Sequence, residues 1–151
     1  MMFLKLNRSR KIRIFAAAAL FFAGCLSSST VKSSSLADDI EKETAALNKN
    51  MERVYQLKSK RLASSGFYYI ISRAGLIVFH PQAVLIGADM SSMSFVAAVL
   101  QQEDGCIEYT VDEKVFILFF RPLNHGNILC LSIPKEEVTD FYGECAGFEI
   151  K

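Results

Sequence analysis

The sequence predicts an α+β domain in which one long helix packs on a five-stranded antiparallel sheet. A long helical pattern without Gly or Pro comes first. Short aromatic and β-branched segments follow, separated by turn residues. The last three of these segments are joined by short connections without helices between them, which is typical of an antiparallel meander.

The helix is predicted over residues 38–62. Asp38 and Asp39 lie at its start and Lys60 and Arg61 near its end, as the helix dipole favours. Apolar side chains recur at intervals of three, four and seven residues: Ile40, Leu47, Met51, Val54, Tyr55 and Leu62. We expect this apolar face to pack on the domain.

Pairing of that face with a partner helix is the alternative. Glu43 and Asn50 interrupt the apolar seam, which disfavours the pairing.

Strands and shorter helices are predicted for the rest of the chain. The strands are 67–73, 76–79, 106–111, 114–121 and 128–133, and the helices are 91–102 and 135–142. Val115–Phe120 is apolar on both faces and therefore belongs in the interior of the sheet. We expect strand 67–73 to pair with strand 128–133.

The first 24 residues are typical of a signal peptide, with a basic segment and then an apolar one. Small residues lead into Cys25, and the site resembles the lipobox of bacterial lipoproteins, although Phe22 stands where that class prefers Leu. The resemblance implies lipidation of Cys25, with residues 25–37 as a Ser-rich tether and 38–151 as the domain.

Two alternatives to lipidation remain. A plain signal peptide could be cut elsewhere, and a transmembrane helix would need about 20 apolar residues. The run Ile14–Leu26 has only 13 residues, which makes the transmembrane reading a poor fit.

The net charge and the absence of catalytic motifs exclude several classes of function. The signal segment holds five of the 17 Lys and Arg residues, so 12 remain against 16 acidic residues, a net charge of −4. Without a basic cluster, nucleic acid is not an expected partner. No Gly-x-Ser-x-Gly, phosphate-binding or HExxH motif is present, so we expect neither an enzyme nor a metal or other cofactor.

Three stretches of the domain resemble the single Cache domain, the PAS-like extracellular sensor module of bacterial chemoreceptors and histidine kinases. They are Gly66–Ile71 followed by Gly75, then Val78–Pro81 followed by Gly87 and Asp89, and finally Gly105–Tyr109 followed by Arg121-Pro122-Leu123 and Ile133-Pro134. The resemblance covers residues 40–138.

The resemblance implies a small-molecule site, for a carboxylate or an amino acid, between the sheet and residues 80–100. We expect Tyr69 to offer a phenol, Asp89 to hold an amine and Arg121 to hold a carboxylate. His80 is either a ligand contact or a turn residue, and Arg121 could instead extend into solvent.

The predicted function is therefore that of a lipid-anchored sensor or accessory binding protein of the bacterial cell envelope, on the periplasmic or outer surface. Its partners would be the membrane, a small ligand and a receptor or envelope protein. The alternative is a structural or interaction lipoprotein without a ligand.

The implied strand order predicts which cysteines can form a disulfide. Cys106 and Cys130 lie two strands apart, about 9–10 Å, which exceeds the roughly 7 Å limit for a disulfide. We therefore expect no bond between them, and we expect Cys145 to be a reactive thiol.

Overall fold

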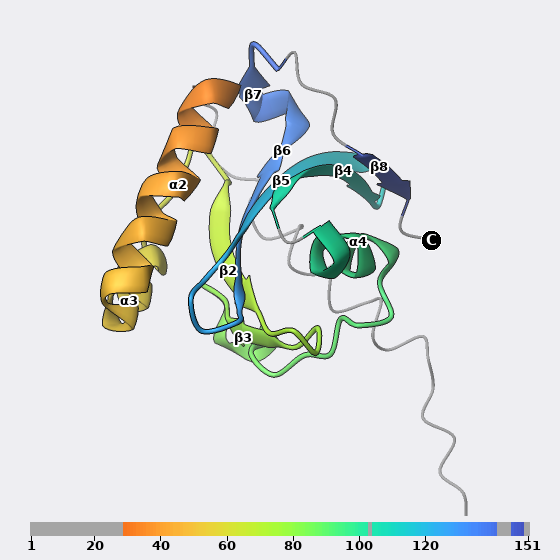
Figure 1. Cartoon of the computed structure of the whole chain (residues 1–151). Helices are drawn as coiled ribbons and strands as arrows, with labels where there is room; N and C mark the ends of the chain where they lie inside the picture. Colours follow the sequence, from red (N-terminus) through yellow and green to blue (C-terminus); the bar gives the residue numbers. More distant parts are fainter. Residues whose placement is uncertain (1–28, 103, 142–145, 150–151) are drawn as a thin grey trace, which may run out of the picture.

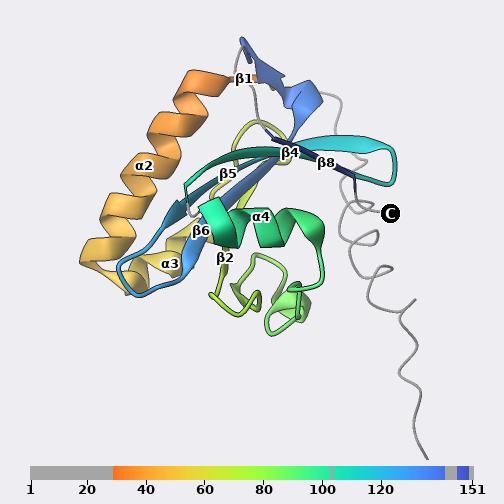
Figure 2. The ribbon, with the colours of Figure 1, turned by 45° about the vertical axis from the view of Figure 1, so that its right-hand side comes forward.

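Helices cover both faces of a central sheet in the computed structural model, which describes residues 29–102, 104–141 and 146–149 (Figure 1). Helix α2 (Ser33–Lys49) lies on one face and α4 (Ser94–Gln102) on the other (Figure 2). The other helical segments are η1 (Met51–Arg53), α3 (Val54–Leu57), η2 (Ala83–Leu85) and η3 (Lys135–Glu137). The predicted α+β class is confirmed.

The main sheet has the strand order β3-β2-β6-β5-β4-β8. Its strands are β2 (Phe67–Ile71), β3 (Ile77–Phe79), β4 (Gly105–Val111), β5 (Lys114–Pro122), β6 (Ile128–Pro134) and β8 (Ala146–Glu149). The first five in this order are antiparallel, β2 pairs with β6, and β5 lies in the interior, all as predicted. Strand β8 adds to β4 in parallel and was not predicted.

Two tight turns set the strand order. Asp112 and Glu113 join β4 to β5 with φ angles of 47° and 66°, the left-handed region that a two-residue hairpin requires. Gly75 turns β2 into β3 at φ 80°, and a Cβ there would lie 2.8 Å from the Cα of Ser91. Glycine is therefore needed at this turn for two reasons.

Helix α2 differs from the predicted helix at both ends. It begins at Ser33, so the last part of the expected tether is helical, and it ends at Lys49. Asn50 is extended, and its Oδ1 accepts a hydrogen bond from Glu52 N (2.9 Å) to begin η1. The prediction of one helix over 38–62 is wrong because a capping Asn can end one helix and begin the next.

The predicted helix over 135–142 is also wrong. Only the single turn η3 forms after Pro134, and strand β7 (Val138–Thr139) follows it. Strand β7 pairs in parallel with β1 (Val31–Lys32), which directly precedes α2. A distant backbone partner decides the conformation of this segment, and local helix signals do not report it.

The core consists of two clusters, one on each side of the sheet. On the α2 side, Leu36, Ile40 and Leu47 pack on β5 and β6, which confirms that the helix packs on the domain. On the α4 side, Phe95, Val96 and Val99 cover the alternate sheet residues. As predicted, Tyr69 and Ile71 face one side of β2, and Tyr68 and Ile70 the other.

The cysteines differ in state. Cys106 on β4 is disulfide-bonded, whereas Cys130 on β6 is a buried free thiol. The predicted absence of a Cys106–Cys130 bond is confirmed, because β5 lies between their strands. Cys25 and Cys145 lie outside the described residues, so a reactive thiol at Cys145 stays a prediction.

A non-reducing peptide map should show a link from the Cys106 peptide and an alkylated Cys130 after unfolding. If Cys145 is a free thiol, the linked partner must be Cys25, which lipidation of its sulfur would exclude, or a cysteine of another molecule. Ile107 and Ala146, which follow Cys106 and Cys145 in the chain, are paired in the sheet. A Cys106–Cys145 link in the map would overturn the predicted reactive thiol, and a Cys106–Cys130 link would contradict the strand order.

Candidate functional site

Buried polar side chains on the α4 side of the sheet form the candidate site. We call them the α4-face polar group: Tyr69, His80, Tyr109, Cys130 and Ser132, all of them buried. They come from β2, β4 and β6 and from the residue after β3, and apolar side chains of the α4 cluster surround them. Polar atoms placed in such a layer need partners, or they mark a place where a ligand finds them.

His80 lies where β3 ends, with its ring centroid 5.2 Å from that of Phe67 and 5.9 Å from that of Tyr69. The Gln82 backbone N–H donates to His80 Nδ1 at 3.0 Å. The neutral ring therefore carries its proton on Nε2. Burial lowers the pKa of His80 to about 4, so the ring is neutral at pH 7. The structure thus shows the turn contact, and a ligand contact stays a proposal.

Tyr69 pairs with Cys130 across β2 and β6. Burial raises the pKa of the Tyr69 phenol well above its usual value and also raises that of the Cys130 thiol. Both groups stay protonated at neutral pH, so they can donate hydrogen bonds but carry no charge. Together with neutral His80 they make this part of the layer polar and uncharged.

Tyr109 occupies the other part of the layer and is held from three sides. Its ring stacks on Phe95 of α4 at 4.7 Å and on Phe116 of β5 at 5.4 Å. Its hydroxyl is 2.6 Å from the Ser132 hydroxyl, and both residues are buried. Burial raises the pKa of Tyr109, with the Ser132 contact acting weakly the other way. This aromatic stack packs the layer beneath α4.

Asp89 lies apart from His80 and Tyr69. It is exposed in the segment after η2, and its Oδ1 accepts hydrogen bonds from Ser91 N (2.9 Å) and Ser91 Oγ (2.6 Å). Its backbone forms a bridge to Leu76, which precedes β3, whereas His80 follows β3. The strand therefore separates the two predicted site residues.

Arg121 lies on the opposite face of the sheet from Tyr69. It pairs with Leu129 of β6, and Leu129 pairs in turn with Ile70 of β2, so all three face α2. Its guanidinium is 3.9 Å from a Glu41 carboxylate oxygen on α2 and 3.6 Å from one of Asp104. The predicted site between Tyr69, Asp89 and Arg121 is not formed, because the register between strands was not visible in the sequence.

Replacing Arg121 by Ala should change the free energy of unfolding by less than about 1 kcal/mol. The Arg121 side chain is 34% exposed and its two acidic partners are more exposed still, so water screens both ion pairs. Urea unfolding of the variant measures the effect. A loss well above this range would show that the two ion pairs act as one buried network.

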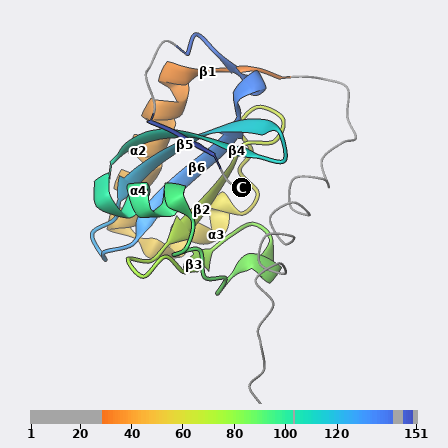
Figure 3. The ribbon, with the colours of Figure 1, turned by 90° about the vertical axis from the view of Figure 1, so that its right-hand side faces the viewer.

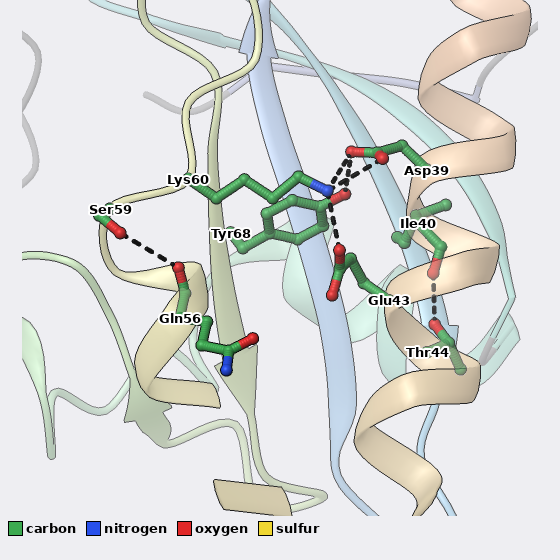
Figure 4. Close-up of polar contacts among 8 residues, drawn as sticks. All are labelled: Asp39, Ile40, Glu43, Thr44, Gln56, Ser59, Lys60 and Tyr68. Atoms are coloured by element: carbon green, nitrogen blue, oxygen red, sulfur yellow. Dashed lines mark hydrogen bonds and ion pairs between the residues drawn. The ribbon is translucent and has the colours of Figure 1, made fainter. Parts of the chain in front are cut away.

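A second polar cluster lies on the other face, between α2 and β2 (Figure 4). We call it the α2-face ion cluster: Asp39, Glu43, Lys60 and Tyr68. Lys60 Nζ lies 2.8 Å from Asp39 Oδ2 and 2.8 Å from Glu43 Oε1, and Tyr68 donates its hydroxyl to Asp39 Oδ2 at 3.0 Å. Three separate segments thus meet at one ammonium group.

The charges of this cluster hold one another in place. Burial alone would lower the pKa of Lys60, but the hydrogen bonds to Asp39 and Glu43 outweigh it and raise that pKa. Burial, and then the charge of Asp39, raise the pKa of the Tyr68 phenol. The sequence interpretation missed this cluster and placed Lys60 only near the end of the predicted helix. The sequence feature that could have revealed the cluster is Glu43, an acidic residue on the apolar face of the helix, one turn after Asp39.

No group of three or more His, Cys, Asp or Glu side chains that could hold a metal ion occurs among the described residues. Within the same residues, no helix is both long and apolar enough to cross a membrane.

Comparisons with known proteins identify the fold. No protein-family model matches the chain, and no curated protein matches it. One similar structure is that of a Cache chemosensory domain that recognises carboxylic acids. It aligns with a TM-score of 0.50 at 14% identity, over 85% of this chain and 95% of that one. The periplasmic sensor domain of a chemotaxis protein aligns with a TM-score of 0.50 at 14% identity, over 87% and 99%.

Other solved structures extend beyond this chain. The ligand-binding domain of Mlp24 with asparagine aligns with a TM-score of 0.46 at 14% identity, over 58% of this chain and 35% of that one. The chain also spans 34% and 38% of the extracellular domains of two proteins described as histidine kinases.

The strand order, the helix on each face and the near-complete alignment with two sensor domains agree with one another. The chain therefore has the Cache/PAS-like fold, in common with these two sensor domains.

Proposed function

We propose that this protein is a lipid-anchored envelope protein that binds a small carboxylate or amino acid on the α4 side of its sheet, as a sensor or accessory binding module. The observation that carries the proposal is the pair Tyr69 and His80. These two uncharged side chains lie near each other, with ring centroids 5.9 Å apart, and the Tyr69 phenol also contacts the Cys130 thiol in a layer whose remaining side chains are mostly apolar.

The chemistry of this pair suits one carboxylate oxygen or a neutral polar group. A hydrogen bond to a charged group contributes about 1.5–3 kcal/mol, more than a neutral one. Charge on the bound molecule would otherwise be costly in an apolar layer. One solved structure with this fold recognises carboxylic acids, which supports the ligand class without placing the ligand here.

Thermal unfolding of the full chain in detergent micelles, against a panel of carboxylates and amino acids, tests the proposal. A ligand at 100 times its dissociation constant stabilises the fold by about 2.7 kcal/mol. Tyr69→Phe removes only the phenol hydroxyl. His80→Asn removes the Nε2 donor while an amide oxygen can still accept from Gln82. Both variants should lose the ligand-induced shift, and His125→Asn, at an exposed position, is the matched control.

The alternative function is that of a structural or interaction lipoprotein. The stack of Phe95, Tyr109 and Phe116 favours it, because aromatic packing fills this part of the layer. If no compound in a broad panel shifts the unfolding temperature, this reading replaces ligand binding. Arg121→Ala lies on the other face and should leave the affinity of any identified ligand unchanged.

The anchor has its own test. Cys25→Ser should abolish lipidation and either release the protein from membranes into the soluble fraction or block its processing. Stable anchoring takes more than one acyl chain, since a single chain binds only marginally. Detergent partitioning and intact mass measure the change. If the mass of the variant differs only by the replacement of sulfur by oxygen and its partitioning is unaltered, the lipoprotein is excluded.

A further inference from the structure

The segment that follows Cys25 is fixed to the domain almost at once. Ser29 N donates to Ser64 Oγ at 3.2 Å, and the two serine hydroxyls are also 3.2 Å apart. Strand β1 then pairs with β7, and α2 begins at the next residue. From Ser29 onward, the backbone is therefore held in the folded domain and cannot extend as a linker between Cys25 and the domain.

Covalent geometry limits the reach of the remaining link. Four peptide units join Cys25 to Ser29, and an extended chain spans at most about 14 Å over that length. The headgroup region of each leaflet is itself roughly 5–8 Å thick. A lipidated Cys25 thus holds Ser29 close to the headgroups.

Three segments build this end of the domain, which we call the β1–β7 pole: residues 29–33, 62–66 and 137–139. The Glu137 carboxylate ties them together. It accepts hydrogen bonds from Ser64 N (3.0 Å), Ser65 N (3.0 Å) and Ser65 Oγ (2.6 Å). The pole is therefore a connected unit whose acidic group is already hydrogen-bonded within the protein.

The surface chemistry of the pole suits lipid headgroups. Its exposed residues include Thr30 and Lys32. A hydroxyl group and an ammonium group can donate to phosphate oxygens, and the hydroxyl adds no charge that an anionic lipid would repel.

We infer that the β1–β7 pole is a membrane-facing surface that rests on phospholipid headgroups, and that the β3–η2 end of the domain points away from the bilayer. The inference rests on the proposed lipidation of Cys25. The two ends are at opposite sides of the molecule, with β1 and β7 at the top and β3 at the bottom (Figures 1 and 3). Gly87 N donates to Ile77 O at 2.7 Å, which holds the η2 segment to β3.

Single tryptophan reporters can test this orientation, because the chain contains no Trp. Ser34→Trp places the reporter at an exposed position beside the pole, and Val84→Trp places it in η2, where Val84 is 83% exposed. The processed full chain is reconstituted in vesicles of phosphatidylethanolamine and phosphatidylglycerol that contain dansyl-labelled headgroups. Energy transfer from Trp to dansyl is then measured.

Transfer from Ser34→Trp should be at least about twofold more efficient than from Val84→Trp, because the link from Cys25 reaches only about 14 Å. Insertion of twenty Gly and Ser residues between positions 28 and 29 should reduce the difference. Equal or reversed efficiencies without the insertion would overturn the inference.

Vesicle flotation separates this outcome from failure of the anchor. If the unmodified chain floats no better than Cys25→Ser, both the anchor and the orientation are overturned. If the chain floats but the transfer is equal, only the orientation fails.

Discussion

Replacing Lys60 by Met should lower the free energy of unfolding by about 2–3 kcal/mol. Removing one partner of a fully buried ion pair costs about 3–5 kcal/mol, because the remaining charge has no counterion. Lys60 is 28% exposed and Glu43 11%, so water reduces the loss. In the variant, the Asp39 and Glu43 carboxylates would remain beside the Tyr68 hydroxyl without a cation. Urea unfolding measures the loss of stability.

Lys135→Met is the matched control. Lys135 Nζ lies 2.8 Å from Glu108 Oε1, the same distance as in the Lys60–Glu43 pair, but Lys135 is 47% exposed. We expect a loss below about 1 kcal/mol. Equal losses in the two variants would show that the α2-face ion cluster has no special role.

The dependence of the free energy of unfolding on alkaline pH gives a second measurement of the α2-face ion cluster. The pKa of Lys60 is raised in the folded state, so its stabilising effect is present below the ordinary value of 10.5 and is lost as the pH rises through the folded-state pKa. The unmodified protein should therefore lose stability above about pH 10.5, and Lys60→Met should lose less there.

Acidification should destabilise the protein through His80, by up to about 3 kcal/mol between pH 6.5 and 4. The folded-state pKa is about 4, against the ordinary 6.5. In this window the unfolded chain binds a proton that the folded ring does not, so stability falls with the pH and levels off below pH 4. The rings packed on His80 are Phe67 and Tyr69, which provide no counterion.

Denaturant unfolding between pH 7 and 4 separates His80 from the acidic residues. His80→Asn has no titrating ring at this position and should lose most of the additional pH dependence, whereas His125→Asn should keep it. If His80→Asn and the unmodified chain respond equally to pH, the imidazole is not held neutral in the folded state.

Local patterns predicted those parts of the fold that depend on neighbours along the chain. Alternation in Phe67–Ile71 placed Tyr69 and Tyr68 on opposite faces, and Val115–Phe120, apolar on both faces, predicted the interior strand β5. The predicted strands 106–111 and 114–121 left a two-residue connection, and Asp112-Glu113 forms it as a tight turn. These signals are local, because strand periodicity and turn geometry depend on consecutive residues.

The candidate site was only partly predictable. Tyr69 and His80 do lie together, because they flank one hairpin. Arg121 does not join them, since a register change of one residue moves a side chain to the other face and no local pattern specifies the register. Lys60, which follows α3, lies in an ion cluster because α2 brings Asp39 and Glu43 to it.

Local patterns were enough to predict the α+β class, the antiparallel order of five strands and the face of each residue within β2. The partner of β7, the parallel addition of β8 and the environment of each charged side chain became visible only in the folded chain. Burial and pairing depend on groups that are distant in the chain. An Arg or Lys has the same local signature whether it faces water or a carboxylate.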